Sequence, residues 1–111
     1  MKNVINLGAV TSNGEIKNLS GKERGEDVRK LFQLDSLDEE PTPIKVIVPD
    51  YIYAISSSFF LGLFSKSVLS RGSADKFLDH YQFEADAAIM KQVAHAINRC
   101  LMPRSAPPSL N

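Results

Sequence analysis

Three consecutive serines, Ser56–Ser58, stand directly before an apolar helical segment, and their hydroxyl groups could act in capping, binding or modification. A helix start leaves backbone amides without partners and carries the positive end of the helix dipole, so hydroxyl groups there can cap the helix or hold an anion. Two interpretations stay open. Either Ser56 or Ser57 is a helix cap, or one of the serines is a regulatory phosphoserine whose added charge changes what docks there.

A second group of polar residues surrounds the start of an earlier predicted helix. Lys22 and Arg24, together with Arg29, could form a small basic patch for a phosphate or a carboxylate, although a solvated helix face explains the same residues. The phosphate-loop pattern is absent, because it requires a first glycine separated by four residues from the Gly-Lys pair and a Ser or Thr directly after that pair. Asp50, which follows a predicted strand and precedes the serines, completes the candidate binding surface.

Catalytic and metal-binding patterns do not emerge from the sequence. No serine has the Gly-x-Ser-x-Gly frame of a hydrolase, and nothing brings His80 or His95 to a serine. The two histidines and the single Cys100 lack the spacing of metal ligands, and we expect Cys100 to lie in the core. The sequence therefore predicts a non-catalytic protein with no metal and no cofactor.

The composition predicts one globular domain. The chain has 111 residues, of which 43% are hydrophobic and 23% charged, and 13 basic side chains balance 13 acidic ones. A balanced charge gives no overall field that favours nucleic acid or an anionic membrane. No signal-peptide pattern and no apolar run of about 20 residues occurs, and the single cysteine fits a reducing compartment, so we expect a cytoplasmic protein.

The first half of the chain predicts a hairpin, a helix and a loop. β-prone residues 4–10 and 16–19 flank an Asn-Gly turn, which favours an antiparallel hairpin. Ser20 and Glu23 have capping-box spacing, so a helix should follow, with Gly25 weakening its first turn and shifting the start toward Glu26. Its predicted apolar stripe comprises Val28, Leu31 and Phe32 and can extend to Leu34, with Glu26, Asp27, Arg29 and Lys30 facing water. The acidic, proline-containing segment 35–43 reads as an exposed connection.

The second half predicts the centre of the sheet and most of the helices. The residues Ile44, Val46, Ile47 and Val48 are β-branched and open a nearly continuous apolar run to Ile55, typical of a central strand buried on both faces, with a bend at Pro49 and Asp50. An apolar helix should follow the serines, then a short helix over 75–81 and an edge strand over 82–84. Residues 87–101 form an amphipathic helix whose buried face comprises Ile89, Val93, Ala96, Ile97 and Cys100.

These elements predict an α/β fold with a small mixed sheet, an N-terminal hairpin and helices packed mainly on one side. We expect residues 1–102 to form the domain and residues 103–111 to form a flexible, proline-rich tail.

Three segments resemble the STAS-like family of small bacterial and phage proteins, formerly a domain of unknown function. They are residues 19–25, 46–51 and 55–64, and the most specific part is Ser-Phe-Phe-x-Gly-Leu-Phe. The resemblance covers about residues 4–85. This family is in turn similar to the domain shared by sulfate transporters and anti-sigma-factor antagonists, which has a small mixed sheet with helices on one side. In the antagonists an Asp-Ser-Ser-Gly turn follows the central strand, and a partner kinase of the histidine-kinase-like ATPase fold phosphorylates its second serine.

The resemblance implies a regulatory protein-interaction module. It aligns Ser57 and Ser58 with the serine pair and thus singles out Ser58 for phosphorylation, while Ser56 replaces the aspartate and Phe59 the glycine of that turn. The implied partner is a histidine-kinase-like ATPase. The alternative from a different class is a sensor that binds a nucleotide or another small anion at the same helix start. A homodimer through a sheet edge is compatible with either.

Overall fold

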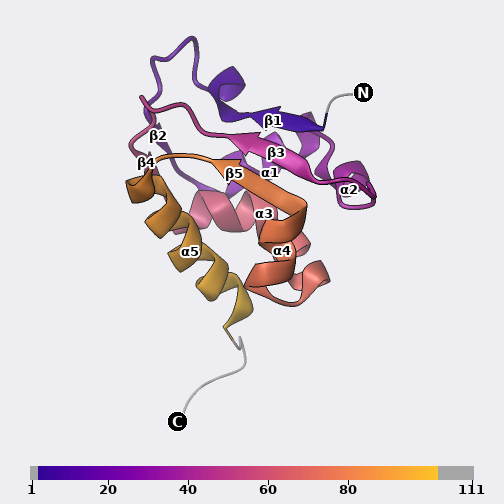
Figure 1. Cartoon of the computed structure of the whole chain (residues 1–111). Coiled ribbons are helices and arrows are strands. Elements are labelled where there is room, and N and C mark those ends of the chain that lie inside the picture. Colours follow the sequence, from indigo (N-terminus) through magenta and orange to yellow (C-terminus); the bar gives the residue numbers. More distant parts are fainter. Residues whose placement is uncertain (1–2, 103–111) are drawn as a thin grey trace.

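The fold is α/β and is built from parallel strand pairs. The computed structural model describes residues 3–102 (Figure 1). The elements in chain order are β1 (Val4–Asn6), the 3-10 helix η1 (Leu7–Val10), β2 (Asn18–Leu19), α1 (Lys22–Leu31), α2 (Leu34–Leu37), β3 (Ile44–Ile47), β4 (Ala54–Ile55), α3 (Ser57–Arg71), α4 (Ala74–His80), β5 (Tyr81–Glu84) and α5 (Ala87–Leu101).

The larger sheet has three parallel strands in the order β1-β3-β5, so β3 is the central strand, as predicted. Val46 lies between Ile5 and Phe83 on the face toward the helices, and Val46 and Ile5 are fully buried. The opposite face is open, because Lys45 is exposed there and forms an ion pair of 2.9 Å with Glu84. The prediction that β3 is buried on both faces is therefore wrong, whereas helices pack mainly on one side, as expected.

The predicted N-terminal hairpin is wrong. The Asn-Gly turn does form, with positive φ at Ser12, Asn13 and Gly14 and a hydrogen bond of 2.9 Å from the Ile16 amide to the Thr11 carbonyl oxygen. The segments on either side do not pair with each other, because β1 pairs with β3 and β2 pairs with β4. Both pairings are parallel, so the sheets are not mixed.

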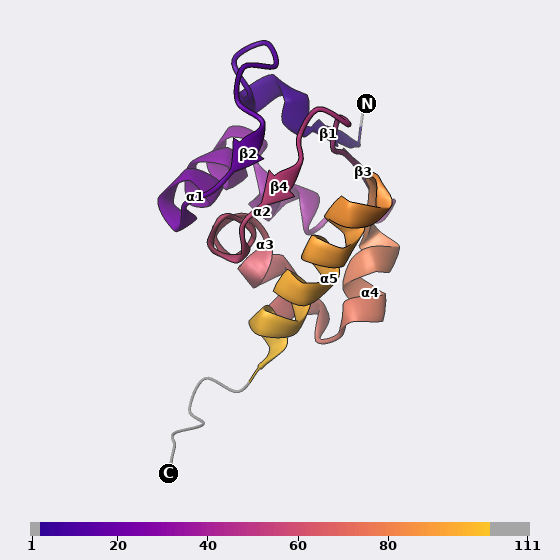
Figure 2. The ribbon, with the colours of Figure 1, turned by 90° about the vertical axis from the view of Figure 1, so that its left-hand side faces the viewer.

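Two strand–helix units lie side by side (Figure 2). β2 leads into α1 and β4 leads into α3, and because β2 and β4 are parallel, both helices begin at the same edge of the molecule. Two glycines allow the helices to touch. A Cβ atom at Gly25 would lie 2.1 Å from the Phe59 carbonyl oxygen, and one at Gly62 would lie 2.1 Å from the Lys22 carbonyl oxygen. Only glycine permits so close an approach of two backbones.

The predicted start of α1 is corrected in two respects. The helix begins at Lys22 rather than Glu26, and its N-cap is Gly21, with φ of 94° and no side-chain cap from Ser20. Gly25 lies inside the helix because α3 crosses there. Leu31, assigned to the apolar stripe, is exposed, while Val28 is buried as predicted.

The central apolar run ends earlier than predicted. A turn at Pro49–Tyr51 separates β3 from β4, and β4 belongs to the two-stranded sheet with β2. The serines therefore follow β4 and not the central strand. The α3 helix then ends at Gly72, which adopts the left-handed conformation with φ of 89°, as expected for a helix terminator.

Aromatic side chains fill the space between the larger sheet and the helices. The ring centroids of Phe60 and Phe64 on α3 lie 5.1 Å apart, and the Phe77 ring on α4 lies 5.3 Å from that of Phe64. Tyr81 and Phe83 of β5 also contact Phe64. The core therefore lies on the helical side of the sheet.

The C-terminal elements agree with the sequence predictions. The short helix is α4, and β5 is an edge strand. Asp86 caps α5, accepting a hydrogen bond of 2.9 Å from the Ile89 amide, and the whole predicted inward face of α5 is buried. The predicted flexible tail lies outside the described residues. Within residues 3–102, no helix combines the length and apolar character that crossing a membrane requires.

Candidate functional site

Ser56 caps α3. Its Oγ accepts a hydrogen bond of 3.0 Å from the Phe59 amide, and its own amide donates one of 2.8 Å to the Leu19 carbonyl oxygen. The second bond continues the β2–β4 pairing into the helix start. The capping interpretation is therefore confirmed for Ser56, and the hydroxyl groups of Ser57 and Ser58 are not needed for this role.

Ser57 and Ser58 differ in exposure. Ser58 is exposed, and its Oγ lies 3.1 Å from that of Ser56. Ser57 is half-buried and lines a shallow groove of about 530 Å³, called here the serine groove. The serine groove is lined by Asn18, Ser20, Ala54, Ile55, Ser56, Ser57, Lys91, Gln92 and His95.

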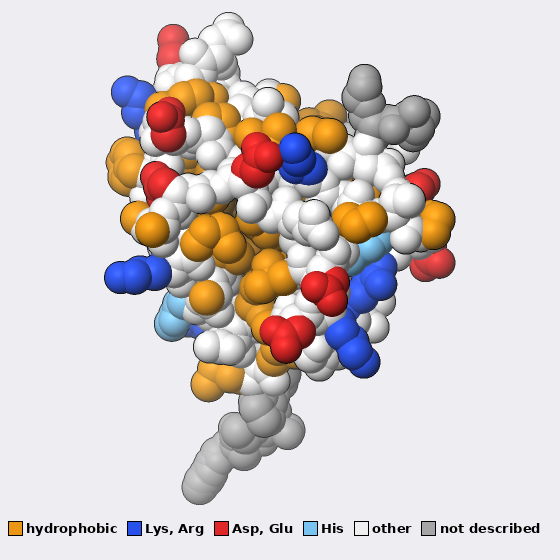
Figure 3. Space-filling view, viewed as in Figure 1, with side chains coloured by type: hydrophobic (Ala, Val, Ile, Leu, Met, Phe, Trp, Pro, Cys, Tyr) orange, Lys and Arg blue, Asp and Glu red, His pale blue; other side chains and the backbone are white. Residues whose placement is uncertain are grey.

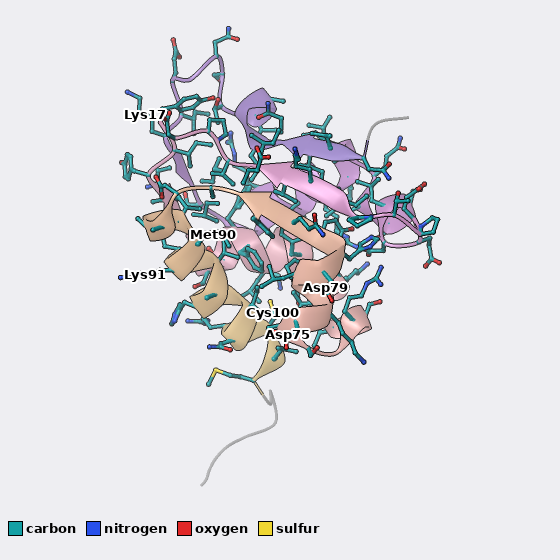
Figure 4. All side chains as sticks on the ribbon, in the orientation of Figure 1. Lys17, Asp75, Asp79, Met90, Lys91 and Cys100 are labelled. Carbon is teal, nitrogen blue, oxygen red and sulfur yellow. The ribbon has the colours of Figure 1, made fainter. Side chains whose placement is uncertain are left out.

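One wall of the serine groove comes from α5. Gln92 fixes that wall to β4, since its Oε1 accepts a hydrogen bond of 2.7 Å from the Ile55 amide and its Nε2 donates one of 3.3 Å to the Tyr53 carbonyl oxygen. Lys91 extends from the outer side of α5 below β4 (Figure 4). The groove thus combines hydroxyl, imidazole and ammonium groups at the edge where both α1 and α3 begin.

The predicted basic patch does not include Arg24. The Arg24 guanidinium turns toward η1 and donates a hydrogen bond of 3.3 Å to the Val10 carbonyl oxygen, while Arg29 is buried. Lys22 and Arg29 both line a groove between α1 and α3, and Arg24 is not among its lining residues. Asp50 is exposed in its turn, where the adjacent Tyr51 hydroxyl lies 2.8 Å from Thr11 Oγ1. Asp50 is therefore held next to the 11–14 turn rather than beside the serines.

A buried polar network that the sequence did not reveal is built around Arg29. Its Nη1 donates to the Leu63 carbonyl oxygen at 2.9 Å and to Ser67 Oγ at 3.0 Å. Its Nη2 forms ion pairs with Asp38 at 2.7 Å and with Asp35 at 2.8 Å. Arg29 was predicted to face water, yet only 9% of its side chain is exposed.

Asp38 is the acceptor of this network. Its Oδ1 accepts hydrogen bonds from Ser67 Oγ at 2.7 Å and from the Tyr81 hydroxyl at 2.5 Å, and its carbonyl oxygen accepts one of 2.8 Å from Arg71. Burial, and then the hydrogen bond to Asp38, raise the pKa of Tyr81 well above its ordinary value. On the rim, the hydrogen bond from Arg29 and then its charge lower the pKa of Asp35.

The network joins α1, α2, α3 and β5, and its hydrogen bonds hold these elements together. Ser67 beside Asp38 resembles a nucleophile next to a base, but Ser67 is 1% exposed and its hydroxyl already bonds to both Asp38 and Arg29. The prediction that residues 35–43 form an exposed connection is therefore wrong around Asp38. A buried arginine needs a carboxylate partner, but nothing in the sequence marks Arg29 as buried.

The histidines and potential metal ligands do not form a further site. His80 is buried, with Nε2 2.8 Å from the Leu37 carbonyl oxygen, and His95 is exposed on α5. Over residues 3–102, no three side chains of His, Cys, Asp or Glu gather in a way that could hold a metal ion.

In comparisons with known proteins, no protein-family model, curated sequence or solved structure matched this chain. The STAS-like resemblance therefore remains a prediction, and arguments about function rest on the geometry of the serines and the grooves.

Proposed function

We propose that this protein is a non-catalytic regulatory module that docks a partner protein at the surface around Ser56–Ser58, and that phosphorylation of Ser58 switches the docking. The observation that carries the proposal is that Ser56 serves as the helix cap whereas Ser58 is exposed beside it. Ser56 caps α3, and Ser58 is exposed in the first helical turn, where its Oγ lies 3.1 Å from that of Ser56. A phosphate added there would meet the positive end of the helix dipole, so the fold would tolerate it while the surface charge changes.

An exposed aromatic side chain next to the serines supports a protein partner. Tyr53 is 65% exposed, and it directly precedes β4, which ends at the serines. Its carbonyl oxygen is held by Gln92, so the ring projects from a fixed backbone. Exposed tyrosines on rigid backbone are frequent anchors of protein interfaces. The STAS-like resemblance adds the class of partner, a histidine-kinase-like ATPase.

Affinity capture from the native host with mass spectrometry tests this proposal. The wild-type chain should recover one dominant partner and carry phosphate on Ser58, and Ser58→Asp should lose that partner. Ser70→Asp is the matched control, because Ser70 is an exposed residue at the other end of α3 and receives the same charge. An unchanged partner set with all three serines unmodified would contradict the proposal.

The serine groove favours a second candidate function, the binding of a small anion such as a nucleotide. Ser57, Lys91 and His95 line it beyond the ends of two parallel strands, where open α/β sheets often bind ligands. A thermal-shift titration with ATP and with inorganic phosphate tests this candidate, since a ligand stabilises by RT ln(1 + [L]/Kd). The melting temperature of wild-type protein should rise with dose, and that of Lys91→Ala should rise less. A flat response from wild-type protein excludes both probes as ligands.

A further inference from the structure

A groove of about 620 Å³ lies between α1, α2 and α3. We name it the α1–α3 groove. It is lined by Lys22, Glu26, Arg29, Lys30, Gln33, Asp35, Ser36, Leu61, Gly62, Ser65 and Lys66. Its α3 wall presents Leu61 and the backbone of Gly62, whereas its rim is charged.

The charge of the α1–α3 groove is predominantly positive. Four basic side chains, Lys22, Arg29, Lys30 and Lys66, line it against two acidic ones, Glu26 and Asp35. Arg29 is paired with Asp35 and also with Asp38, so the positive charge of the groove comes from its three lysines. In the part of the chain that the structure describes, none of these three lysines forms an ion pair. On the face shown in Figure 3, by contrast, acidic and basic side chains are both scattered among hydrophobic ones.

The lysines are divided between the two ends of the groove. Arg29 donates a hydrogen bond to Ser67. Lys30, which follows Arg29, and Lys66, which precedes Ser67, therefore lie at the same end of the groove. Lys22 lies at the other end, where its carbonyl oxygen meets Gly62. Lys30 follows Lys22 by eight positions in α1, a distance of about 12 Å along the axis at 1.5 Å per residue. An extended peptide covers about the same distance in four residues at roughly 3.3 Å each.

Ser58 stands at the Lys22 end of the groove. It precedes Leu61, Gly62 and Ser65 by three, four and seven residues, which places it on the same stripe of α3, one turn beyond the groove wall. A phosphate on Ser58 would therefore bring about −1.5 to −2 charges to the end of the groove where Lys22 lies.

We propose that the α1–α3 groove binds an extended acidic segment of the partner protein, with carboxylates about four residues apart and an apolar side chain between them. Phosphorylated Ser58 competes with the carboxylate at the Lys22 end. The inference rests on the proposed function for the existence of a partner. Charge complementarity selects the occupant: two cationic ends separated by Leu61 match two anionic residues that flank an apolar one.

Selection from a random twelve-residue peptide library on the purified full-length chain tests this inference. Enriched peptides should carry Asp or Glu at positions i and i+4. The affinity of a synthetic enriched peptide, measured by fluorescence polarisation, should fall at least about tenfold in Lys30→Glu and in Lys66→Glu, and should fall at high salt. Lys76→Glu on α4 is the matched control and should bind like wild type. Ser58→Asp should weaken binding severalfold.

Each contrary outcome overturns a defined part of the inference. Enrichment of non-acidic peptides, no enrichment, or unchanged affinity in Lys30→Glu and Lys66→Glu overturns the groove assignment, and unchanged affinity in Ser58→Asp overturns the competition. Repeating the host capture with Lys30→Glu separates this failure from that of the proposed function. If Lys30→Glu keeps the partner of the wild-type chain, the module stands and the groove assignment falls. If acidic peptides bind but the host yields no partner, the groove stands and the proposed function falls.

Discussion

The network around Arg29 and the serines at the start of α3 contain similar functional groups, yet they differ in how many hydrogen bonds are already made. In the network, Asp38 accepts from Ser67, Tyr81 and Arg29, and these groups lie in the interior. At the helix start, Ser56 is engaged as a cap but Ser58 is exposed. Residue type alone therefore does not distinguish a polar group that is already bonded in the interior from one that is exposed at the surface.

The largest effect is expected from Asp38→Ala. The substitution removes the acceptor of two hydroxyl groups and leaves the buried Arg29 with only the rim carboxylate of Asp35, which should cost about 3 kcal/mol of unfolding free energy or more. Urea denaturation measures the loss. Asp35→Ala is the matched control and should cost much less, because 81% of the Asp35 side chain is exposed. Equal losses would show that the buried network contributes no more than its rim.

A smaller effect is expected at the helix cap. Ser56→Ala removes the acceptor of the Phe59 amide and should cost about 1 kcal/mol, whereas Ser57→Ala should stay within about 0.5 kcal/mol. Thermal or urea unfolding of the two variants gives the comparison. A larger loss of stability in Ser57→Ala than in Ser56→Ala would show that Ser57, and not Ser56, is the cap.

Negative charge at Ser58 should stabilise the protein slightly. In Ser58→Asp the carboxylate lies in the first turn of α3, so the helix dipole should add about 0.3–1 kcal/mol at low ionic strength. Ser70→Asp, in the last turn, should instead lose a similar amount. Both differences should shrink in 1 M salt. A destabilised Ser58→Asp chain would mean that a phosphate there disrupts the fold, contrary to the proposed switch.

The smallest effect is the pH dependence that comes from Asp35. Because its pKa in the folded protein lies below the ordinary 3.8, the ionised carboxylate stabilises the fold fully above that value, and the contribution disappears as pH falls through the lowered pKa. Asp35→Asn should therefore be less stable than wild type at neutral pH and equally stable in strong acid. A difference between the two chains that is independent of pH would contradict this assignment.

Local patterns predicted the local parts of the structure. The spacing of Ile89, Val93 and Ile97 was sufficient for α5 and its buried face, and residue type was sufficient to identify a serine cap. The α/β class followed from the order of such elements.

Predictions failed where distant residues determine the outcome. The turn at Asn13 and Gly14 formed, but the strands beside it found partners far along the chain, which no local pattern specifies. Gly25 read as a weak point of a helix because its contact with Phe59 cannot be read from its neighbours. Arg29 stands among charged residues in the sequence and was therefore predicted to face water, although in the structure Asp38 and Ser67 enclose it.

The parallel strand pairings also bear on how the protein reaches its fold. Val4 pairs with Lys45, Asn18 with Ala54 and Ile44 with Tyr81, so every ladder closes a long loop. Loop closure costs entropy before any contact compensates for it, and mixed α/β domains accordingly fold more slowly than helical bundles of similar stability. During synthesis, β2 and α1 are made before their partners β4 and α3. Until α3 is made, the surface of α1 that Gly62 later covers stays exposed.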